Sequence, residues 1–357
     1  KSVGRVDLGN TQTDSMDLER KRGITIKASA ISFNWKDIKI NLLDTPGHVD
    51  FVSEVERSLS VLDGAVLVIS AVEGIQSQTR ILFNTLKALK IPTIIFINKL
   101  DRTGANSQRV IDEIKKNMSD KVVSIQEVYD EGGKEVSVGE LFESDLVMEN
   151  ALEVLADTDE AFLEEYINGV KYDKNTIKEK LSHFSRRGDI YPVFCGAASI
   201  GLGISNLLDG ICDFLPIAEE DSSGALSGVV FKIERTNGNE KKVYVRLFQG
   251  MVSVRDTLEV PKKDMVEKVK KINVLENGKL IDASSIKAGD IGVLYGLSSF
   301  QIGDIIGISS ERIKSISLAK PTLKTTISAL NKDDNSKLFK ALTMLTEEDP
   351  LLEVETD

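Results

Sequence analysis

Five consecutive residues could carry out phosphate chemistry: Asp44, Thr45, Pro46, Gly47 and His48, which directly follow a predicted strand. A carboxylate at the end of a strand can hold Mg²⁺ through its water shell. A glycine lets a backbone N–H approach a phosphate, because no Cβ stands in the way. His48 would then lie beside an attacking water. The same letters also suit an ordinary turn built on Pro and Gly, so the stretch alone does not establish a site.

A second polar stretch, Asn98-Lys99-Leu100-Asp101, also follows an apolar run. The Asp101 carboxylate can accept hydrogen bonds from the N1–H and N2–H₂ groups of guanine, which adenine does not offer. The stem of Lys99 can lie along the plane of the base, and the Asn98 amide can tie neighbouring loops together. A plain polar loop after a strand is the alternative. The motif predicts a guanine-binding loop.

The elements around the two motifs predict an α/β domain. Residues 65–70 and 93–97 are β-branched runs typical of buried parallel strands, and residues 75–89 between them have helical spacing. The predicted buried face of that helix consists of Ile81, Leu82, Leu86 and Leu89. A strand, a helix and a strand over this length form a βαβ unit. Further along, residues 192–195 are predicted as a strand and residues 203–214 as a helix.

The two motifs are expected to lie close together. We place the strand at residues 39–43, which leads into Asp44, in the same sheet as residues 93–97. Ligands bind at the carboxyl edge of open α/β sheets. The prediction is therefore one ligand site that contains both motifs.

Together, the motifs resemble the third and fourth motifs of the translational GTPases. Residues 22–26, Arg-Gly-Ile-Thr-Ile, resemble their switch I signature, in which the hydroxyl of Thr25 would coordinate Mg²⁺ when GTP is bound. Residues 13–25, 57–65 and 74–83 are similar to the tetracycline ribosomal-protection proteins, which are paralogues of elongation factor G. Residues 244–250 and 334–350 resemble domains II and III of either group.

The resemblance implies a fold. Residues 1–220 would form a P-loop-type GTPase (G) domain, an α/β domain with a mostly parallel sheet and helices on both faces, with an acidic insert at about 104–190. Residues 221–312 would form an antiparallel β-barrel, domain II, and residues 313–357 the start of an α+β domain III. In this last part the sequence predicts a strand at residues 323–329 and a helix capped by Asn335 or Ser336.

The resemblance also implies a function, a GTPase that acts on the ribosome. It would release tetracycline and be recycled by GTP hydrolysis. The alternatives are a translocase of the elongation factor G type and a non-catalytic ribosome-binding module. His48 would be catalytic, and Thr25 and Asp44 would bind Mg²⁺. The residues implied to bind GTP or GDP are Asp44, Thr45, Pro46, Gly47, His48, Asn98, Lys99, Leu100, Asp101, Ala197 and Ala198.

The sequence departs from the family pattern at two places. No Gly-x-x-x-x-Gly-Lys-[Ser/Thr] loop occurs in it, so we expect a fragment that is weak or inactive as a GTPase by itself. At residues 195–199, Cys-Gly-Ala-Ala-Ser, Ala197 replaces the usual serine and its hydrogen bond is expected to be lost. The backbone N–H of Ala198 could still meet the guanine O6, although a small-residue turn before a helix is the alternative.

Composition limits the partners. A net charge of −11, with 45 Lys and Arg against 56 Asp and Glu, argues against a protein that grips naked DNA. No apolar run reaches the length of a membrane span, and two cysteines give no disulfide framework. We therefore expect a cytoplasmic monomer that binds neither DNA nor membrane. Residues 127–165 hold 14 Asp and Glu against one lysine, which suits either a solvated face or docking to a basic ribosomal protein.

Overall fold

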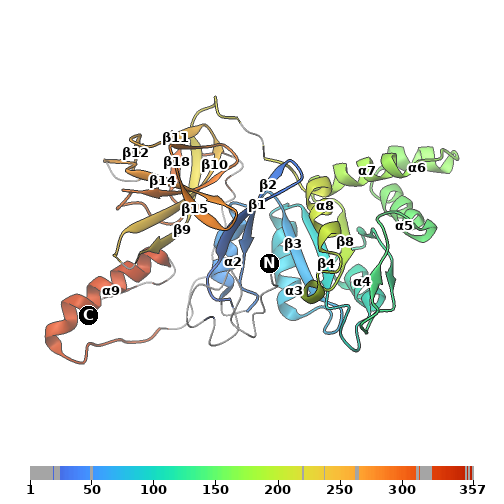
Figure 1. The fold of residues 1–357 in the computed structure, drawn as a ribbon, viewed down its shortest axis with the longest axis horizontal. Helices are drawn as coiled ribbons and strands as arrows, with labels where there is room; N and C mark the ends of the chain where they lie inside the picture. Colours follow the sequence, from blue (N-terminus) through green and yellow to red (C-terminus); the bar gives the residue numbers. More distant parts are fainter. Residues whose placement is uncertain are drawn as a thin grey trace. The chain divides into compact units, whose positions relative to one another are not determined.

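A parallel sheet of four strands organises residues Leu62–Ile217, one of two compact units in the chain (Figure 1). We call it the α/β unit. Its strands, in spatial order, are β3 (Ala65–Ser70), β4 (Thr93–Asn98), β8 (Tyr191–Cys195) and β5 (Val122–Ser124). In the register, Ile97 lies opposite Cys195, so the carboxyl ends of β4 and β8 are level. The predicted βαβ arrangement around residues 65–98 is confirmed.

The structure is a computed structural model that describes residues 19, 25–48, 51–218, 221–236, 238–261, 265–310, 313, 324–349, 352, 354 and 355. Among these, the second unit takes its residues from Val6–Val61 and Ala218–Asp357. We call it the β unit. The predicted domain limits at residues 220/221 and 312/313 stay a prediction, because compact units need not coincide with domains.

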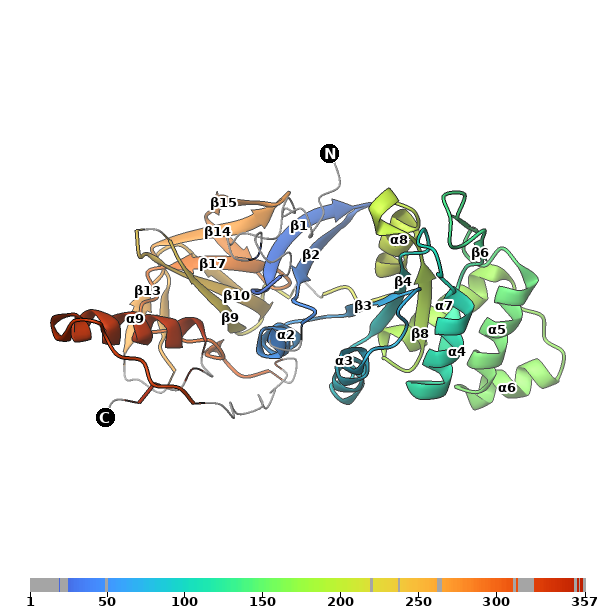
Figure 2. The same cartoon turned by 90° about the horizontal axis from the view of Figure 1, so that it is seen from below.

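Helices cover both faces of the parallel sheet, since alternate strand residues point to opposite sides. Ile94 and Phe96 belong to a core shared with α5, α7 and α8, whereas Ile95 and Ile97 belong to a core shared with α3 and α4 (Figure 2). The helices are α3 (Ser77–Ala88), α4 (Ser107–Asn117), α5 (Asp145–Ala156), α6 (Glu160–Ile167), α7 (Lys174–Arg186) and α8 (Ile204–Phe214).

The buried face of α3 differs from the predicted one. Phe83 and Leu86 are its buried residues, while Ile81 is 50% exposed. The Phe83 ring lies 4.9 Å from the ring of Tyr191 on β8. This large aromatic contact turns the Phe83 side of the helix toward the sheet, so the aliphatic stripe chosen from the spacing was wrong at Ile81.

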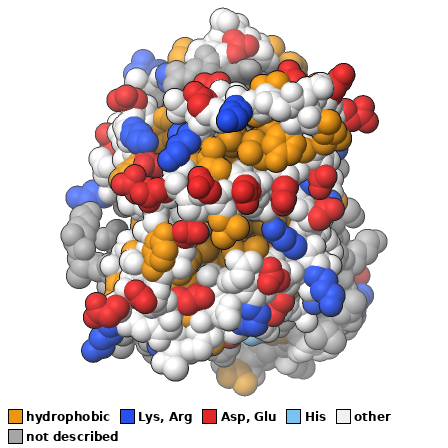
Figure 3. All heavy atoms as spheres, turned by 90° about the vertical axis from the view of Figure 1, so that its right-hand side faces the viewer, with side chains coloured by type: hydrophobic (Ala, Val, Ile, Leu, Met, Phe, Trp, Pro, Cys, Tyr) orange, Lys and Arg blue, Asp and Glu red, His pale blue; other side chains and the backbone are white. Residues whose placement is uncertain are grey.

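The acidic insert contains the short ribbon of β6 (Val128–Tyr129) and β7 (Ser137–Val138) together with α5, α6 and α7. Its interior is apolar: Phe162 is fully buried and stacks on Tyr172 at 4.7 Å. On the side of the unit that carries the insert, rows of Asp and Glu lie beside bands of apolar side chains (Figure 3). Leu146 and Ile167 are strongly exposed in α5 and α6.

The first described strands of the β unit, β1 (Ser29–Trp35) and β2 (Ile38–Asp44), form a hairpin, and α2 (Val52–Leu59) follows it. Its main sheet has six antiparallel strands. In spatial order they are β15 (Lys279–Ala283), β14 (Lys271–Glu276), β17 (Ile291–Tyr295), β10 (Lys241–Gln249), β9 (Ser227–Arg235) and β18 (Ile305–Gly307). Two ribbons pair β11 (Met251–Ser253) with β16 (Ser285–Lys287), and β12 (Thr257–Glu259) with β13 (Val266–Lys268). The expected α/β fold followed by antiparallel β structure is confirmed.

The predicted position of the strand before Asp44 was wrong. Within the described residues, β2 pairs with β1 and is no part of the parallel sheet. The two strands are adjacent in sequence and joined at Lys36-Asp37, with Lys36 at φ 51°, so a hairpin pairs them locally. Ala30 and Leu43 of the hairpin pack on the apolar cluster at β9, β10 and β17. The two motifs therefore do not share one sheet edge here.

The last described helix is α9 (Asn335–Glu348), as predicted, but its cap differs. The N-cap residue is Asp334, and no side chain caps the helix by a hydrogen bond. Residues 324–329 are irregular instead of a strand, and residue 323 lies outside the described residues. None of the helices in the described part of the chain is long and apolar enough to cross a membrane.

Gly203→Ala should lower the stability of the α/β unit markedly. Gly203 caps the start of α8 at φ +76°, and an added Cβ would meet the Cys195 carbonyl oxygen at 2.3 Å. Backbone strain and this clash together should cost about 3 kcal/mol. Gly201→Ala is the matched control, because Gly201 also has positive φ (+77°) but open space around it, so only about 1 kcal/mol is expected. Urea unfolding of both variants measures the difference, and equal losses would contradict it.

Candidate functional site

The side chain of Asn98 joins the loop after β4 to the loop after β8. Its Oδ1 accepts hydrogen bonds from the backbone N–H of Lys99 at 2.8 Å and of Ala198 at 2.9 Å. The backbone supports the same junction, because Leu100 N–H donates to the Gly196 carbonyl at 3.2 Å. The tie between neighbouring loops suggested for Asn98 is thus present, and both loops lie at the carboxyl edge of the parallel sheet.

Lys99 and Leu100 position the loop in different ways. Lys99 has φ 69°, and this left-handed turn directs the chain away from the strand. Its exposed ammonium pairs with Glu73 Oε1 at 3.2 Å. Leu100 is fully buried in the core beneath the loop. Leu100 therefore anchors the loop through packing, and its side chain does not face outward.

Asp101 presents a half-satisfied carboxylate at this edge. Its Oδ2 accepts a hydrogen bond from the Ser199 hydroxyl at 2.9 Å. Its Oδ1 is buried and has no hydrogen-bond partner among the described residues. A buried acceptor without a donor is costly. Because this oxygen has no exposed surface, it can meet a donor from outside the protein only if the side chain turns about its Cβ–Cγ bond. The base-recognition role of Asp101 stays a prediction.

The loop after β8 differs from expectation in two respects. The N–H of Ala198 already donates to Asn98 Oδ1, so it is not held ready for guanine O6. Buried Ala197 offers no side-chain donor, whereas Ser199, two residues later, donates its hydroxyl to Asp101 Oδ2. The sequence reasoning missed Ser199, and its only signal was a hydroxyl next to the small-residue loop. Burial raises the pKa of the Cys195 thiol to about 12, so this cysteine remains a neutral core residue.

The stretch at residues 44–48 belongs to the β unit and follows β2. Pro46 is buried, whereas Gly47 and His48 are exposed. An added Cβ on Gly47 would meet nothing within 4 Å, and its φ is not in the left-handed region. Neither packing nor backbone conformation therefore requires this glycine. The His48 ring lies 6.1 Å from the ring of Phe51 at the start of α2.

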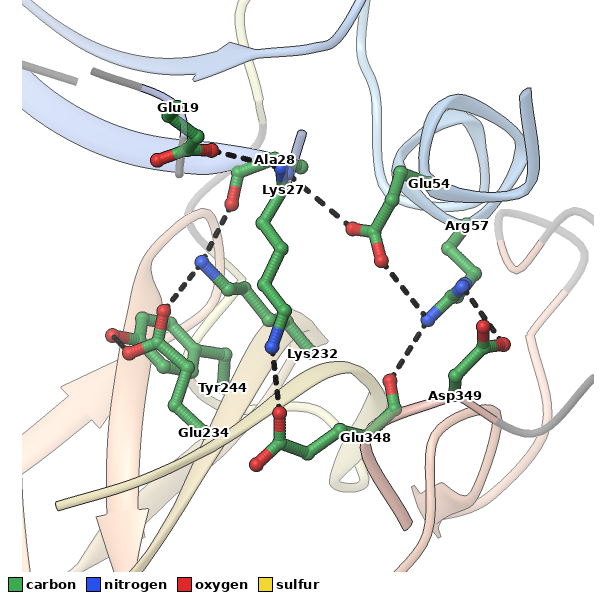
Figure 4. Close-up of polar contacts among 10 residues, drawn as sticks. All are labelled: Glu19, Lys27, Ala28, Glu54, Arg57, Lys232, Glu234, Tyr244, Glu348 and Asp349. Carbon is green, nitrogen blue, oxygen red and sulfur yellow. Dashed lines mark hydrogen bonds and ion pairs between the residues drawn. The ribbon is translucent and has the colours of Figure 1, made fainter. Parts of the chain in front are cut away.

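Residues 26–28, directly after Thr25, are held by side chains from several segments (Figure 4). Glu19 Oε1 accepts from the N–H of Ile26 and of Lys27, both at 3.0 Å. Glu54 Oε2 of α2 accepts from the N–H of Ala28 at 3.3 Å. The Ala28 carbonyl accepts from Lys232 Nζ of β9 at 2.5 Å. Side chains thus satisfy backbone N–H and C=O groups of residues 26–28, which in a sheet would pair with a neighbouring strand.

Arg57 links α2 to the end of α9 in the same cluster. Its guanidinium is buried and lies 3.3 Å from Glu54 Oε1. It also donates to the Glu348 carbonyl at 2.9 Å and to Asp349 Oδ1 at 3.0 Å. Lys27 Nζ lies 2.6 Å from Glu348 Oε2. The segment after Thr25, helix α2 and the end of α9 therefore share one polar network (Figure 4).

The donor types at Thr25 and Asp44, a hydroxyl and a carboxylate, are oxygen ligands of the kind that Mg²⁺ takes. Both residues are half-buried and both belong to the β unit. The described residues contain no group of three or more His, Cys, Asp or Glu side chains placed to hold a metal by themselves. Any Mg²⁺ here would take most of its ligands from elsewhere, as from phosphates and water.

A four-stranded parallel sheet with helices on both faces, and with Asn98 and Asp101 at its carboxyl edge, places residues Leu62–Ile217 in the class of open α/β domains, which bind ligands at that edge. The family described as "Elongation factor Tu GTP binding domain" matches residues 2–217, and the chain belongs to this family.

Individual proteins are similar over nearly the whole chain. The tetracycline resistance protein TetP of Clostridium perfringens is 68% identical over 352 residues, which cover 99% of this chain and 54% of that protein. The oxytetracycline resistance protein of Streptomyces rimosus is 38% identical, with 99% and 55% covered. A crystal structure of a Thermus thermophilus protein matches with a TM-score of 0.85 at 24% identity, covering 99% of this chain and 57% of that one, which shows the fold. The chain thus spans little more than half the length of the relatives it matches.

The polar cluster predicts an acid-dependent loss of stability in the β unit. Burial alone would raise the pKa of Glu234, but Lys232 at 2.7 Å and the Tyr244 hydroxyl outweigh burial and hold this pKa below its ordinary value. A lowered native pKa contributes stability above the unfolded-state pKa, and the contribution is lost as pH falls through the native pKa. Glu234→Gln should cost about 1–2 kcal/mol at pH 7 and progressively less in acid.

Urea unfolding between pH 7 and pH 3 measures this difference. Glu259→Gln on β12, where the side chain is exposed, is the control. Its effect on the free energy of unfolding should not change with pH in this way. A Glu234→Gln cost that is the same at both ends of the range would contradict the assignment.

Proposed function

We propose that this chain is part of a GTPase that acts on the ribosome and confers tetracycline resistance. The observation that carries the proposal is the 68% identity to a tetracycline resistance protein across 99% of this chain. It is supported by the family of residues 2–217 and by the Asn98–Asp101 edge in the α/β unit. Release of tetracycline from the ribosome would be the activity, and GTP hydrolysis would recycle the protein.

In this proposal the α/β unit recognises the guanine base. The carboxylate of Asp101, turned about its Cβ–Cγ bond so that both oxygens face the base, would accept the N1–H and N2–H₂ groups of guanine. Adenine offers no pair of donors on that edge, so the contact selects guanine. Asn98 would keep the two loops together, and the aliphatic stem of Lys99 would cover the plane of the base.

The residues proposed to act on phosphate and in hydrolysis are Thr25, Asp44, Gly47 and His48. The exposed N–H of Gly47 is open to a close approach by the γ-phosphate, because nothing in the protein occupies the space where a Cβ would stand. The Thr25 hydroxyl and the Asp44 carboxylate would hold Mg²⁺, which when bound neutralises charge on phosphate oxygens. His48, which is exposed, would orient the attacking water and be positioned by the ribosome.

Asp101→Asn should change which nucleotide binds. The amide keeps one acceptor but adds a donor, so it suits the C2 carbonyl of xanthine better than the 2-amino group of guanine. We expect GDP affinity to fall about tenfold or more and xanthosine diphosphate affinity to rise. Saturation-transfer NMR titration of both nucleotides measures the change. Asp120→Asn, an exposed aspartate before β5, is the matched control, and an unaltered preference in Asp101→Asn would remove this residue from base recognition.

His48→Ala in the full-length protein should cut ribosome-stimulated GTP hydrolysis by orders of magnitude while GDP binding is kept. The reason is that an oriented water lowers the barrier of the chemical step without adding to ground-state affinity. Phosphate release in the presence of ribosomes measures the rate. His183→Ala, which removes the other of the two histidines, serves as the control. Equal turnover in His48→Ala and in the unmodified protein would contradict the catalytic role proposed for His48.

The same full-length protein tests the ribosomal function itself. Reconstituted translation at an inhibitory tetracycline concentration should recover when the protein is added. Support of translation when elongation factor G is withheld, without rescue from the drug, would instead favour the translocase. No effect in either setting would contradict both the resistance function and the translocase.

A further inference from the structure

The side chain of Lys99 reaches from the loop after β4 to the turn after β3. Its Nζ lies 3.2 Å from Oε1 of Glu73 and 3.3 Å from Oε2, so the ammonium faces both carboxylate oxygens. The two strands are neighbours in the sheet and end level, because Ser70 lies opposite Asn98 in the register. The stem of Lys99 therefore runs along the carboxyl edge of the sheet, between the loop that holds Asp101 and the next turn.

Glu73 has a defined position because hydrogen bonds close its turn. The hydroxyl of Ser70, at the end of β3, donates to the Glu73 carboxylate and accepts from the N–H of Val72 at 3.2 Å and of Glu73 at 3.3 Å. The Gly74 N–H donates to the Ser70 carbonyl at 2.9 Å. Gln76 Nε2 donates to the Glu73 carbonyl at 3.0 Å. Both the side chain and the backbone of Glu73 are thus held within the turn.

Helix α4 holds the same turn against the loop after β4. The Arg109 guanidinium donates from Nη2 to the Ala71 carbonyl at 3.2 Å and to the Val72 carbonyl at 2.9 Å. The Ala71 N–H donates to the Asn98 carbonyl at 2.8 Å. The carboxylate of Glu73 is therefore presented on a backbone that other contacts already fix, which lowers the entropic cost of an exposed ion pair.

Burial does not explain the pairing of Glu73 with Lys99. The side chain of Glu73 is 51% exposed and that of Lys99 is 47% exposed, so the pair adds little to the core and little to the stability of the unit. The carboxylate acts mainly on the Lys99 ammonium, and through it on the conformation of the stem.

We infer that Glu73 is a positioning residue of the base site, which holds the Lys99 ammonium at the turn after β3 and leaves the methylene stem to cover the plane of a base. The inference rests on the contact proposed between Lys99 and guanine. A lysine joins a charged head to a long flexible stem, and a stem without a partner at its end samples many conformations. The ion pair selects extended conformations before the nucleotide arrives, so less freedom is lost on binding.

The test is the affinity of GDP for Glu73→Gln, which keeps the shape of the side chain and removes its charge. GDP is an anion, so the loss of a nearby negative charge would by itself strengthen binding. Loss of the positioning contact should instead weaken GDP about threefold at low salt. The sign of the change therefore separates the two effects. Saturation-transfer NMR titration of the whole chain measures the affinity, because this method reaches weak binding.

Two further measurements tie the effect to the ion pair and to the plane of the base. At about 1 M salt, where exposed charges are screened, Glu73→Gln and the unmodified chain should bind GDP equally. Inosine diphosphate lacks the 2-amino group, which the stem of Lys99 does not contact in this proposal. Glu73→Gln should therefore weaken inosine diphosphate by the same factor as GDP, so the preference between the two nucleotides stays unchanged.

Two variants and a stability measurement make the result specific. In a Lys99→Met background, which keeps an apolar stem without the ammonium, Glu73→Gln should cause no loss, since its effect passes through Lys99. Glu179→Gln is the matched control, because Glu179 is an exposed residue of α7 in the same unit and the net charge changes equally. This control should not weaken GDP. Urea unfolding should give Glu73→Gln and the unmodified chain the same midpoint.

The outcomes separate the inference from the function on which it rests. If the unmodified chain binds GDP and Glu73→Gln binds it equally well or more tightly at low salt, the inference is overturned while the guanine-binding proposal stands. If Glu73→Gln also weakens GDP in the Lys99→Met background, or if the loss persists at high salt with a lower unfolding midpoint, Glu73 only supports the turn and the inference is again overturned. If the unmodified chain does not bind GDP, the base contact of Lys99 fails and the inference fails with it.

Discussion

Two backbone N–H groups converge on the Oδ1 atom of Asn98, and the geometry of the candidate base site depends on this convergence. The loop after β4 and the loop after β8 are far apart in sequence, but parallel pairing sets their strand ends level. An apolar side chain at position 98 would leave two N–H groups without an acceptor, at about 1–3 kcal/mol for each that is buried. Asp101 and Ser199 face each other only because this junction holds both loops.

In the β unit, too, side chains hold an irregular segment by binding its backbone groups, as Asn98 does in the α/β unit. Residues 26–28 lie outside any described strand pairing, and carboxylates of Glu19 and Glu54 and the ammonium of Lys232 satisfy their backbone groups. A buried charge is tolerated when it is paired and hydrogen-bonded. Arg57 meets this condition through α9 as well as through α2. The segment after Thr25 is consequently sensitive to the packing of helices on either side.

Local patterns predicted much of this molecule, whereas pairings between distant segments could not be obtained from them. The β-branched runs at β3 and β4 and the polar residues directly after them placed Asp101 at a strand end. The partner of β2 was missed because no strand was assigned at residues 29–35, so a hairpin was mistaken for part of the parallel sheet. The Ser199–Asp101 bond depends on the register of β4 against β8 across 98 residues. Spacing within either motif carries no information about that register.

The two sets of candidate residues are suited to different thermodynamic tasks. Asp101 accepts a hydrogen bond from the Ser199 hydroxyl without any base present. Under the proposed function it would contribute to selection of the base and not to the rate of the chemical step. Gly47 and His48 are exposed and are not fixed by burial. Groups of this kind can contribute more to a transition state than to the ground state, provided that a partner orders them when the reaction occurs. Under the proposed function, Asp101 would therefore contribute to binding of the base, whereas Gly47 and His48 would contribute to hydrolysis once the ribosome orders them.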